Sequence, residues 1–184
     1  QAMSAQAIEN LKSLGKAVDH LTAALKSNDD RTRRSALEIL NQQPDLITPA
    51  LYEMVRKALL ESRSRGIQQA AFGNGIRRWA QKMGREQEFL TEAFDHGTSG
   101  MRRAVVGWLR GMETGWAEAL LLKGMADRDT GIAQIAFSEL LQRNQVRGTE
   151  QDFLKKTYAD SRPLRNRVVE RLASHEGDWV EEIL

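Results

Sequence analysis

The spacing of apolar residues predicts helices along the whole chain. Near the N-terminus, large apolar residues recur every three or four positions, at Ile8, Leu11, Leu14, Val18, Leu21 and Leu25. This spacing matches the turn of an α-helix and not the alternation of a β-strand. The same period, interrupted by short polar segments, predicts helices at 4–26, 30–42, 49–61, 64–82, 86–95, 99–112, 115–125, 130–143, 149–158 and 162–174. We therefore expect an all-α protein.

Residues that cap helices stand at regular places in the chain. One such residue precedes each of five predicted helices: Asp29, Ser64, Thr98, Asp129 and Ser161. Their side-chain oxygens accept hydrogen bonds from the free amides of a first helical turn. Thr48 followed by Pro49 marks another start, because proline lacks only an amide that the first turn leaves unpaired. These positions support the predicted helix boundaries.

Segments of the sequence recur at a nearly constant spacing. Residues 65–72 match 130–137 at five of eight positions, 84–90 match 148–154 at five of seven, and 115–118 match 178–181 more weakly. The offsets are 65, 64 and 63 residues. Within this unit, equivalent small or β-branched residues recur 31 to 35 residues apart, at Ala36, Ala71, Val105, Ala136 and Val168. The chain therefore contains about five repeats, each of two helices.

The repeats define the expected domain organisation. We expect a single repeat domain over 4–184, with repeats near 4–42, 49–82, 86–112, 115–143 and 149–174. Residues 175–184 form either a partial sixth repeat or a cap. The first three residues, Gln1 to Met3, are typical of a protease-site remnant and are left out of this scheme.

The turn and second helix of each unit resemble those of HEAT-like repeats. Residues 29–37 and 127–136 follow the family's approximate pattern D-x-D-x-x-V-R-x-x-A. At the Val-Arg pair of the pattern, Met101-Arg102 keeps an apolar residue followed by arginine, whereas Ile132-Ala133 lacks the arginine. The resemblance implies a right-handed α-solenoid of about five HEAT-like helix pairs, whose second helices line a concave groove.

Composition excludes several chemistries. The 184 residues include no cysteine and three histidines, which excludes disulfides, thiolate nucleophiles and cysteine-ligated metals. No phosphate-binding loop, nucleophile elbow or zinc-hydrolase motif is present. We therefore expect no enzyme activity, no cofactor and no metal. The longest apolar run, 119–122, is far shorter than the roughly 20 residues of a membrane span. We expect a cytoplasmic location, and a secretory signal removed before residue 1 remains an alternative.

Charge is uneven along the chain and points to candidate binding residues. The formal net charge is +2, yet residues 30–110 carry +5 and residues 111–184 carry −3. Arginine and glutamine gather at the start of the second helices, at Arg33, Arg34, Gln68, Gln69, Arg102, Arg103, Gln134 and Arg165. Guanidinium groups bind carboxylates and phosphates well. In HEAT-like repeats such arginines also tie neighbouring turns to the repeat aspartate, and both roles stay open here.

The segment 73–75, Gly-Asn-Gly, interrupts a predicted helix. Each interior glycine costs roughly 1 kcal/mol relative to alanine. The interruption marks close helix packing, a kink or the approach of a partner, and Gly107 and Ser138 occupy the aligned position. The neighbouring Arg77, Arg78 and Trp79 are added to the candidate binding residues for this reason. Tryptophans either anchor interfaces or fill cores, so Trp79 has two readings.

Two functions from different classes follow. The preferred one is a non-catalytic protein-protein interaction scaffold, which binds an acidic or polar segment of another protein through its groove. The alternative is a nucleic-acid-binding or DNA-repair protein resembling the DNA alkylation repeat glycosylases, in which the arginines hold phosphates. The net charge of +2 argues against broad phosphate binding. A third possibility, a protein resembling the HEAT-like bilin lyases, rests on fold analogy alone.

Overall fold

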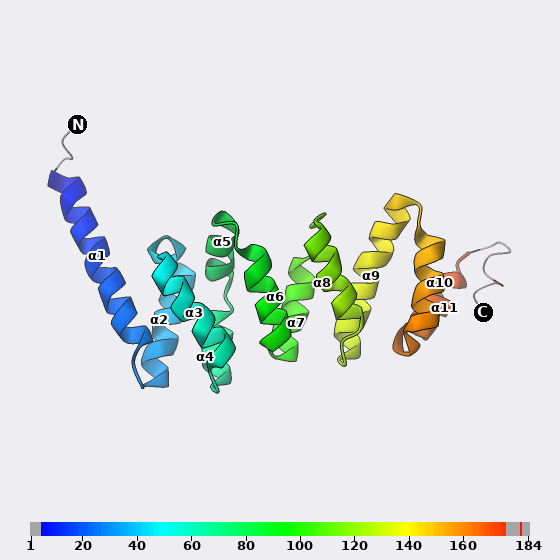
Figure 1. Ribbon diagram of the computed structural model, residues 1–184, viewed down its shortest axis with the longest axis horizontal. Helices are drawn as coiled ribbons and strands as arrows, with labels where there is room; N and C mark the ends of the chain where they lie inside the picture. The colour runs from blue at the N-terminus through cyan, green and yellow to red at the C-terminus, as the bar shows by residue number, and fades with distance from the viewer. Residues whose placement is uncertain (1–4, 176–180, 182–184) are drawn as a thin grey trace. The chain divides into compact units, whose positions relative to one another are not determined.

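The chain is all-helical in the residues that the structure describes (Figure 1). This computed structural model describes the backbone of residues 5–175 and 181, and the side chains of 12–175 and 181. Eleven α-helices and two short 3-10 helices make up this part of the chain, without a strand. Residues 1–3 and most of the segment 175–184, the expected cap or sixth repeat, lie outside the described residues. The chain divides into two compact units, Gln1–Met101 and Arg102–Leu184.

The N-terminal unit contains the first six α-helices, the 3-10 helix η1 and the beginning of the seventh α-helix. These are α1 (Ala5–Leu25), α2 (Asp30–Gln42), η1 (Pro44–Leu46), α3 (Pro49–Glu61), α4 (Arg65–Ala71), α5 (Asn74–Lys82) and α6 (Glu86–His96). The helix α7 (Ser99–Trp108) runs from this unit into the next. Within the unit, α2 packs against α4 and α5, and α3 packs against α6.

The C-terminal unit contains the remaining helices. These are α8 (Gly115–Met125), α9 (Thr130–Arg147), α10 (Glu150–Asp160), η2 (Arg162–Leu164) and α11 (Arg165–Leu172). Neighbouring helices pack in chain order, α8 on α9, α9 on α10 and α10 on α11. Most helix boundaries predicted from the sequence lie within two residues of those in the structure. The predicted helix 99–112 ends at Trp108, and the one predicted to end at 143 continues to Arg147.

Three of the predicted caps accept hydrogen bonds from helix amides. The Asp29 carboxylate accepts from Thr32 N at 2.8 Å, and the Asp129 carboxylate accepts from Gly131 N at 2.9 Å. The Thr98 hydroxyl accepts from Met101 N at 3.4 Å. Ser64 and Ser161 occupy cap positions without a side-chain cap bond. Local capping therefore fixes the start of α2, α7 and α9.

The predicted helix 64–82 is broken at its glycines, because α2 passes very close. A Cβ on Gly73 would lie 1.8 Å from the Asn41 side chain, and one on Gly75 would lie 1.9 Å from the Asn41 carbonyl oxygen. Asn41 Nδ2 donates to Ala70 O at 2.7 Å, and Ile76 N donates to Asn41 Oδ1 at 3.2 Å. The asparagine thus pairs with backbone groups that the break between α4 and α5 leaves free. Close packing and a kink occur together here.

The aligned Gly107 does not repeat this close approach. A Cβ at Gly107 would find no other atom within 4 Å among those described, and the residue is exposed. Gly107 and Gly73 therefore align in sequence, but only Gly73 lies close to a neighbouring helix.

Aromatic side chains pack together in the core of the N-terminal unit. Tyr52 is fully buried and packs against Trp79, with ring centroids 4.7 Å apart. The Arg85 guanidinium lies 4.5 Å from the centroid of the Tyr52 ring. Burial raises the pKa of the Tyr52 hydroxyl above its ordinary value. Trp79 is 5% exposed, so it fills the core and offers little surface to a partner.

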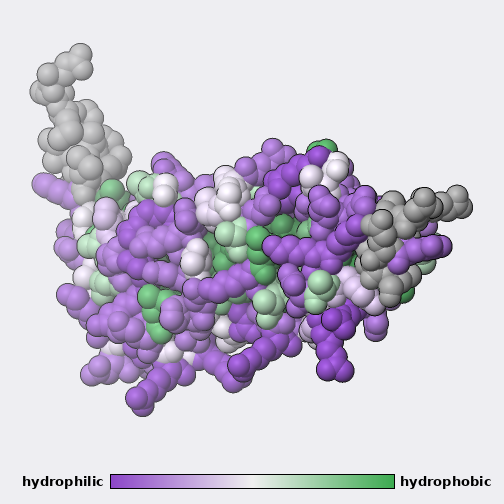
Figure 2. Space-filling model, turned by 45° about the vertical axis from the view of Figure 1, so that its right-hand side comes forward, coloured by the Kyte–Doolittle hydropathy of each residue, from purple (hydrophilic) through white to green (hydrophobic). Residues whose placement is uncertain are grey.

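The core of the C-terminal unit gathers around α9, α10 and α11. Its buried residues include Ala133, Phe137, Leu154, Leu164, Val168 and Leu172. Phe153 stacks on Phe137, with centroids 5.7 Å apart. Hydrophilic residues cover most of the molecular face shown in Figure 2, and apolar residues reach it only in smaller areas. No helix in the described part of the chain is long and apolar enough to span a bilayer.

Candidate functional site

The predicted arginines are mostly paired with carboxylates of their own chain. The pairs are Arg33 with Asp30, Arg34 with Glu38, Arg77 with Glu86, Arg102 with Asp127 and Arg103 with Asp129. An incoming anion would compete with a carboxylate at each of these places. The pairs differ in burial and in hydrogen bonding, and these differences decide which arginines are available to a partner.

The pair of Arg102 and Asp127 is the best enclosed among these. Arg102 Nε lies 2.7 Å from Asp127 Oδ2, Arg102 Nη2 lies 3.1 Å from Oδ1, and the Asp127 side chain is 5% exposed. Burial alone would raise the pKa of Asp127. The hydrogen bonds from Arg102 and from the Asp129 amide outweigh burial and hold this pKa below its ordinary value. Arg102 is therefore engaged in joining α7 to the turn before α9.

The other predicted residues lie in varied environments. Gln134 Oε1 accepts from Arg167 Nη2 at 3.0 Å. Arg165 Nε donates to Tyr158 O at 2.8 Å, so it caps the end of α10. Gln69 and Arg78 are exposed, and Gln68 is half-buried. The hydrogen bonds thus place Gln134 against α11 and Arg165 against the end of α10.

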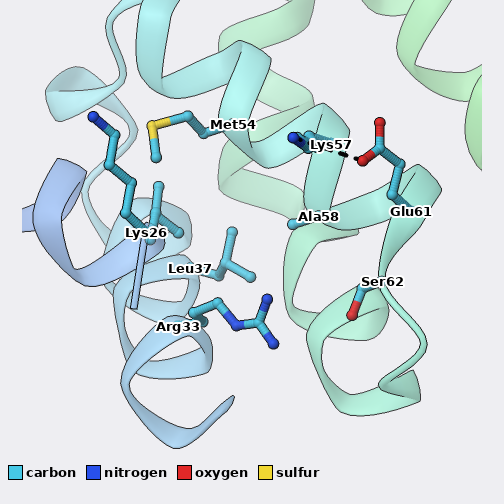
Figure 3. Close-up of a pocket in the computed structure, with 9 residues that line it drawn as sticks. Lys26, Arg33, Leu37, Met54, Lys57, Ala58, Glu61 and Ser62 are labelled. Atoms are coloured by element: carbon cyan, nitrogen blue, oxygen red, sulfur yellow. Dashed lines mark ion pairs between the residues drawn. The ribbon is translucent and has the colours of Figure 1, made fainter. Parts of the chain in front are cut away.

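A pocket in the N-terminal unit brings Arg33 together with two lysines (Figure 3). Its volume is about 400 Å³. Its lining combines the end of α1, one face of α2 and the second half of α3: Leu25, Lys26, Arg33, Leu37, Met54, Lys57, Ala58, Glu61 and Ser62. We call this the basic pocket. Figure 3 shows Leu37 and Ala58 between the Arg33 guanidinium and the Lys57 side chain, so apolar groups separate the cations.

The cations of the basic pocket are only partly neutralised. The Lys57 ammonium lies 3.8 Å from Glu61 in an exposed pair, which contributes little. Arg33 Nη2 binds Asp30, while Arg33 Nε is buried and has no hydrogen-bond partner among the described residues. The hydrogen bond from Arg33 is the main reason that the pKa of Asp30 lies below its ordinary value. With Lys26, the lining holds three cations and one carboxylate.

The lysines of the basic pocket were not among the predicted residues. Lys26 follows α1 and Lys57 lies on α3, whereas the predicted residues all lie on α2, α4, α5, α7, α9 and α11. Repeat spacing alone does not say which faces of α1, α2 and α3 surround one pocket. A search for basic residues on both helices of adjacent repeats would have included them.

The pocket suits ionic and apolar contacts and shows no catalytic set. Within the described residues, no group of three histidine, aspartate or glutamate side chains is placed to hold a metal ion. The lining contains one hydroxyl, Ser62, and no histidine that could act as its base. The arrangement can hold an anionic group beside a small apolar one.

Comparison with known proteins adds no family to this picture. The chain matches no family model, no curated protein and no solved structure. The side chains and their geometry therefore carry the functional conclusion.

Proposed function

We propose that this chain is a non-catalytic protein-protein interaction scaffold built from HEAT-like helix pairs arranged as a right-handed solenoid. Its N-terminal unit binds an acidic segment of a partner protein at the basic pocket. The observation that carries this proposal is the position of Lys26, Arg33 and Lys57 around an apolar floor.

The chemistry of the pocket fits an aspartate or glutamate beside an apolar residue. The unpartnered Arg33 Nε needs an acceptor, since a buried donor without one costs about 1 to 3 kcal/mol. A carboxylate supplies that acceptor, and further acidic residues of the same segment reach the lysines at the rim (Figure 3). An apolar neighbour in the partner covers Leu37 and Met54, which adds affinity in proportion to the area removed from water.

Exposed ion pairs are individually weak, so we expect modest affinity with clear dependence on salt. Each exposed pair contributes about 0.2 to 1 kcal/mol, and salt screens it. A scaffold of this kind gains affinity from several such contacts along its partner. The arginine and glutamine residues of the second helices are further contact points in this proposal.

Charge reversal at the two lysines tests the proposal with little risk to folding. Neither lysine belongs to a buried pair, in contrast to Arg102, whose reversal would also expose Asp127. We expect Lys26→Glu combined with Lys57→Glu to weaken binding of a fluorescent Glu- and Leu-rich peptide about tenfold, the sum of two exposed pairs. Fluorescence polarisation at two salt concentrations measures this.

The matched control is Lys82→Glu, because Lys82 is exposed on α5 and does not line the pocket. Its peptide affinity should equal that of the parent protein. Equal binding by the double variant would overturn the assignment of the pocket. Tighter, strongly salt-dependent binding of a labelled DNA duplex, also lost in the double variant, would favour the nucleic-acid alternative.

A further inference from the structure

A second pocket of the N-terminal unit adjoins the basic pocket. Its volume is about 230 Å³, and it lies between the beginnings of α2 and α4. The residues that line it are Asp30, Arg31, Arg34, Ser64, Gly66 and Ile67. We call this the turn pocket. It shares no lining residue with the basic pocket, so the acidic-segment site proposed above does not include it.

Two contacts form the partition between the pockets. Arg33 of the basic pocket pairs with Asp30 of the turn pocket. Ser62 lines the basic pocket and Ser64 lines the turn pocket, and Ser64 N donates to Ser62 Oγ at 3.2 Å. Both serines have extended backbone, so their Cα atoms are separated by roughly 7 Å. A partner chain therefore crosses the partition within a few residues.

Arg34 reaches across the turn pocket from α2 to α4. A Cβ added to Gly66, in the first turn of α4, would lie 3.9 Å from Arg34 Nη1. Arg34 is bound to Glu38, one turn along α2, and both side chains of this pair are at least half exposed. Such a pair contributes little, so Arg34 can turn to an incoming anion at small cost.

Three further guanidinium groups of this surface are unpaired. The exposed side chains of Arg31, Arg63 and Arg65 make no hydrogen bond and no ion pair with the part of the chain that the structure describes. Arg31 lines the turn pocket, and the other two lie in the connection to α4 and at its first residue. Guanidinium forks match the two oxygens of a carboxylate, so this surface is prepared for acidic side chains.

Nearby carboxylates do not cancel these cations. Asp29 caps α2, and Asp30 belongs to the pair in the partition. Segments 26–38 and 57–65 supply every charged residue of both pockets, and they contain seven lysines and arginines against four aspartates and glutamates. The surface therefore keeps a net charge of +3, which is complementary to an anionic partner.

Separate acidic side chains fit this surface better than a continuous phosphate backbone. The carboxylates Asp30, Glu38 and Glu61 lie among the cations and repel an evenly charged polyanion. The linings also include apolar groups, with Leu37 in the basic pocket and Ile67 in the turn pocket. The methylene groups of a glutamate can cover such a surface while its carboxylate meets a guanidinium.

We propose that the turn pocket is a second subsite for the same acidic segment of the partner protein. One aspartate or glutamate binds in the basic pocket, and another, about two to four residues along an extended chain, binds Arg31 and Arg34. The inference rests on the proposed function and adds to it the spacing of the acidic residues. Arg63 and Arg65 attract the segment during its approach.

Two fluorescent peptides of equal length test the second subsite. Both contain one Glu-Leu pair for the basic pocket. The two-site peptide has further glutamates three residues before and three residues after this pair, so it reaches the turn pocket in either chain direction; the one-site peptide has glutamines there. We expect the two-site peptide to bind about fivefold tighter in fluorescence polarisation, the gain of one or two exposed ion pairs.

Arg31→Gln combined with Arg34→Gln should remove this gain. We expect the two peptides to differ less than about twofold in this variant, while the affinity of the one-site peptide stays within about twofold of its value for the parent protein. Circular dichroism should show the parent helix content, because both arginines are exposed. A gain that persists in this variant, or equal binding of the two peptides by the parent protein, would overturn the second subsite.

The matched control is Lys16→Gln combined with Lys82→Gln. It removes the same net charge from exposed positions of the N-terminal unit that line neither pocket. The fivefold gain should remain in this control. Loss of the gain here as well as in the arginine variant would show general attraction by net charge and would contradict a second subsite.

The one-site peptide separates this inference from the proposed function. If it does not bind, or binds equally after Lys26→Glu with Lys57→Glu, the acidic-segment function is wrong and the second subsite with it. If it binds as expected and the two-site peptide gains nothing, only the second subsite is wrong. A labelled single-stranded DNA that binds tighter than the two-site peptide, and loses affinity in the arginine variant, would assign the turn pocket to phosphate groups and overturn the proposal.

Discussion

The two units use different chemistry to join helices that are neighbours in space. In the N-terminal unit, the neutral amide of Asn41 bridges α2 to the broken helix α4 and α5. In the C-terminal unit, α9 reaches the residues after α7 through a nearly buried ion pair. There Arg143 Nη2 donates to Leu109 O at 2.8 Å, and Gly111 N donates to Glu139 Oε1 at 3.1 Å. The same kind of helix contact is thus made with neutral or with charged side chains.

This difference has energetic consequences. The amide of Asn41 does not titrate, so its hydrogen bonds do not depend on pH. The ion pair of Arg143 and Glu139 requires both groups to be charged, and its attraction must offset the cost of removing the two charges from water. The side chains of Arg143 and Glu139 are 9% and 10% exposed, so water does not easily take the place of either partner in the ion pair. The pockets differ in the opposite sense, since the unit with the neutral joint presents cations and the unit with the charged joint presents a largely apolar surface between α8 and α10.

The largest predicted effect comes from removing one partner of the buried pair. Arg143→Met leaves Glu139 without its cation, and Leu109 O keeps only the hydrogen bond from Met112 N. We expect the free energy of unfolding to fall by about 3 kcal/mol, the lower end of measured losses for such pairs. Chemical denaturation by urea, followed by circular dichroism, measures this change.

The double variant Arg143→Met with Glu139→Leu is the control for that experiment. It removes both charges and replaces them with apolar groups, so it should recover part of the lost stability. If the double variant has a lower free energy of unfolding than Arg143→Met, the two losses add, and the ion pair does not act as a unit.

A smaller effect is expected at the glycine joint of the N-terminal unit. Gly75→Ala would place its Cβ 1.9 Å from the Asn41 carbonyl oxygen, so α2 and α5 must move apart. We expect a loss of about 2 kcal/mol, typical of overpacking. Gly107→Ala meets open space within a helix and should instead gain about 0.5 to 1 kcal/mol. Equal shifts in melting temperature for both variants would contradict the close approach at Gly75.

The smallest effect concerns pH and again separates neutral from charged contacts. The pKa of Asp127 is lower in the folded chain than the ordinary value of 3.8, so its contribution is present above about pH 4. That contribution disappears as pH falls through the folded pKa. The destabilisation caused by Asp127→Asn should therefore shrink between pH 7 and pH 3, while the destabilisation caused by Asn41→Ala stays constant. Urea denaturation at both pH values distinguishes the two variants.

Helix positions were predictable because local signals set them. Apolar period and capping residues placed α2, α3 and α8 at their observed bounds. The break in 64–82 was visible as two glycines, but its cause was not, because Asn41 lies more than 30 residues earlier. The extension of α9 to Arg147 was missed because Gly148, at a positive φ of 72°, ends the helix later than the apolar pattern does.

The candidate site was predictable only in part, for a related reason. Arg33 was identified from its repeat position, whereas Lys26 and Lys57 join it through the packing of α1, α2 and α3. The ionic partners of Arg77 and Arg102 lie 9 and 25 residues away, so sequence alone did not distinguish a paired arginine from a free one. Trp79 had two readings, and its burial against Tyr52 decides for the core.

Three glycines with similar positive φ values lie in turns that follow helices. Gly84, Gly111 and Gly148 have φ values of 70°, 72° and 72°, the only positive values among the described residues, and they follow α5, α7 and α9 respectively. Gly84 and Gly148 are separated by the same 64 residues as the matching sequence segments around them. Four whole helices, α6 to α9, lie between Gly84 and Gly148, so a break in the chain at either glycine cuts no helix. Residues inserted at these turns would therefore leave the hydrogen bonds of every helix intact.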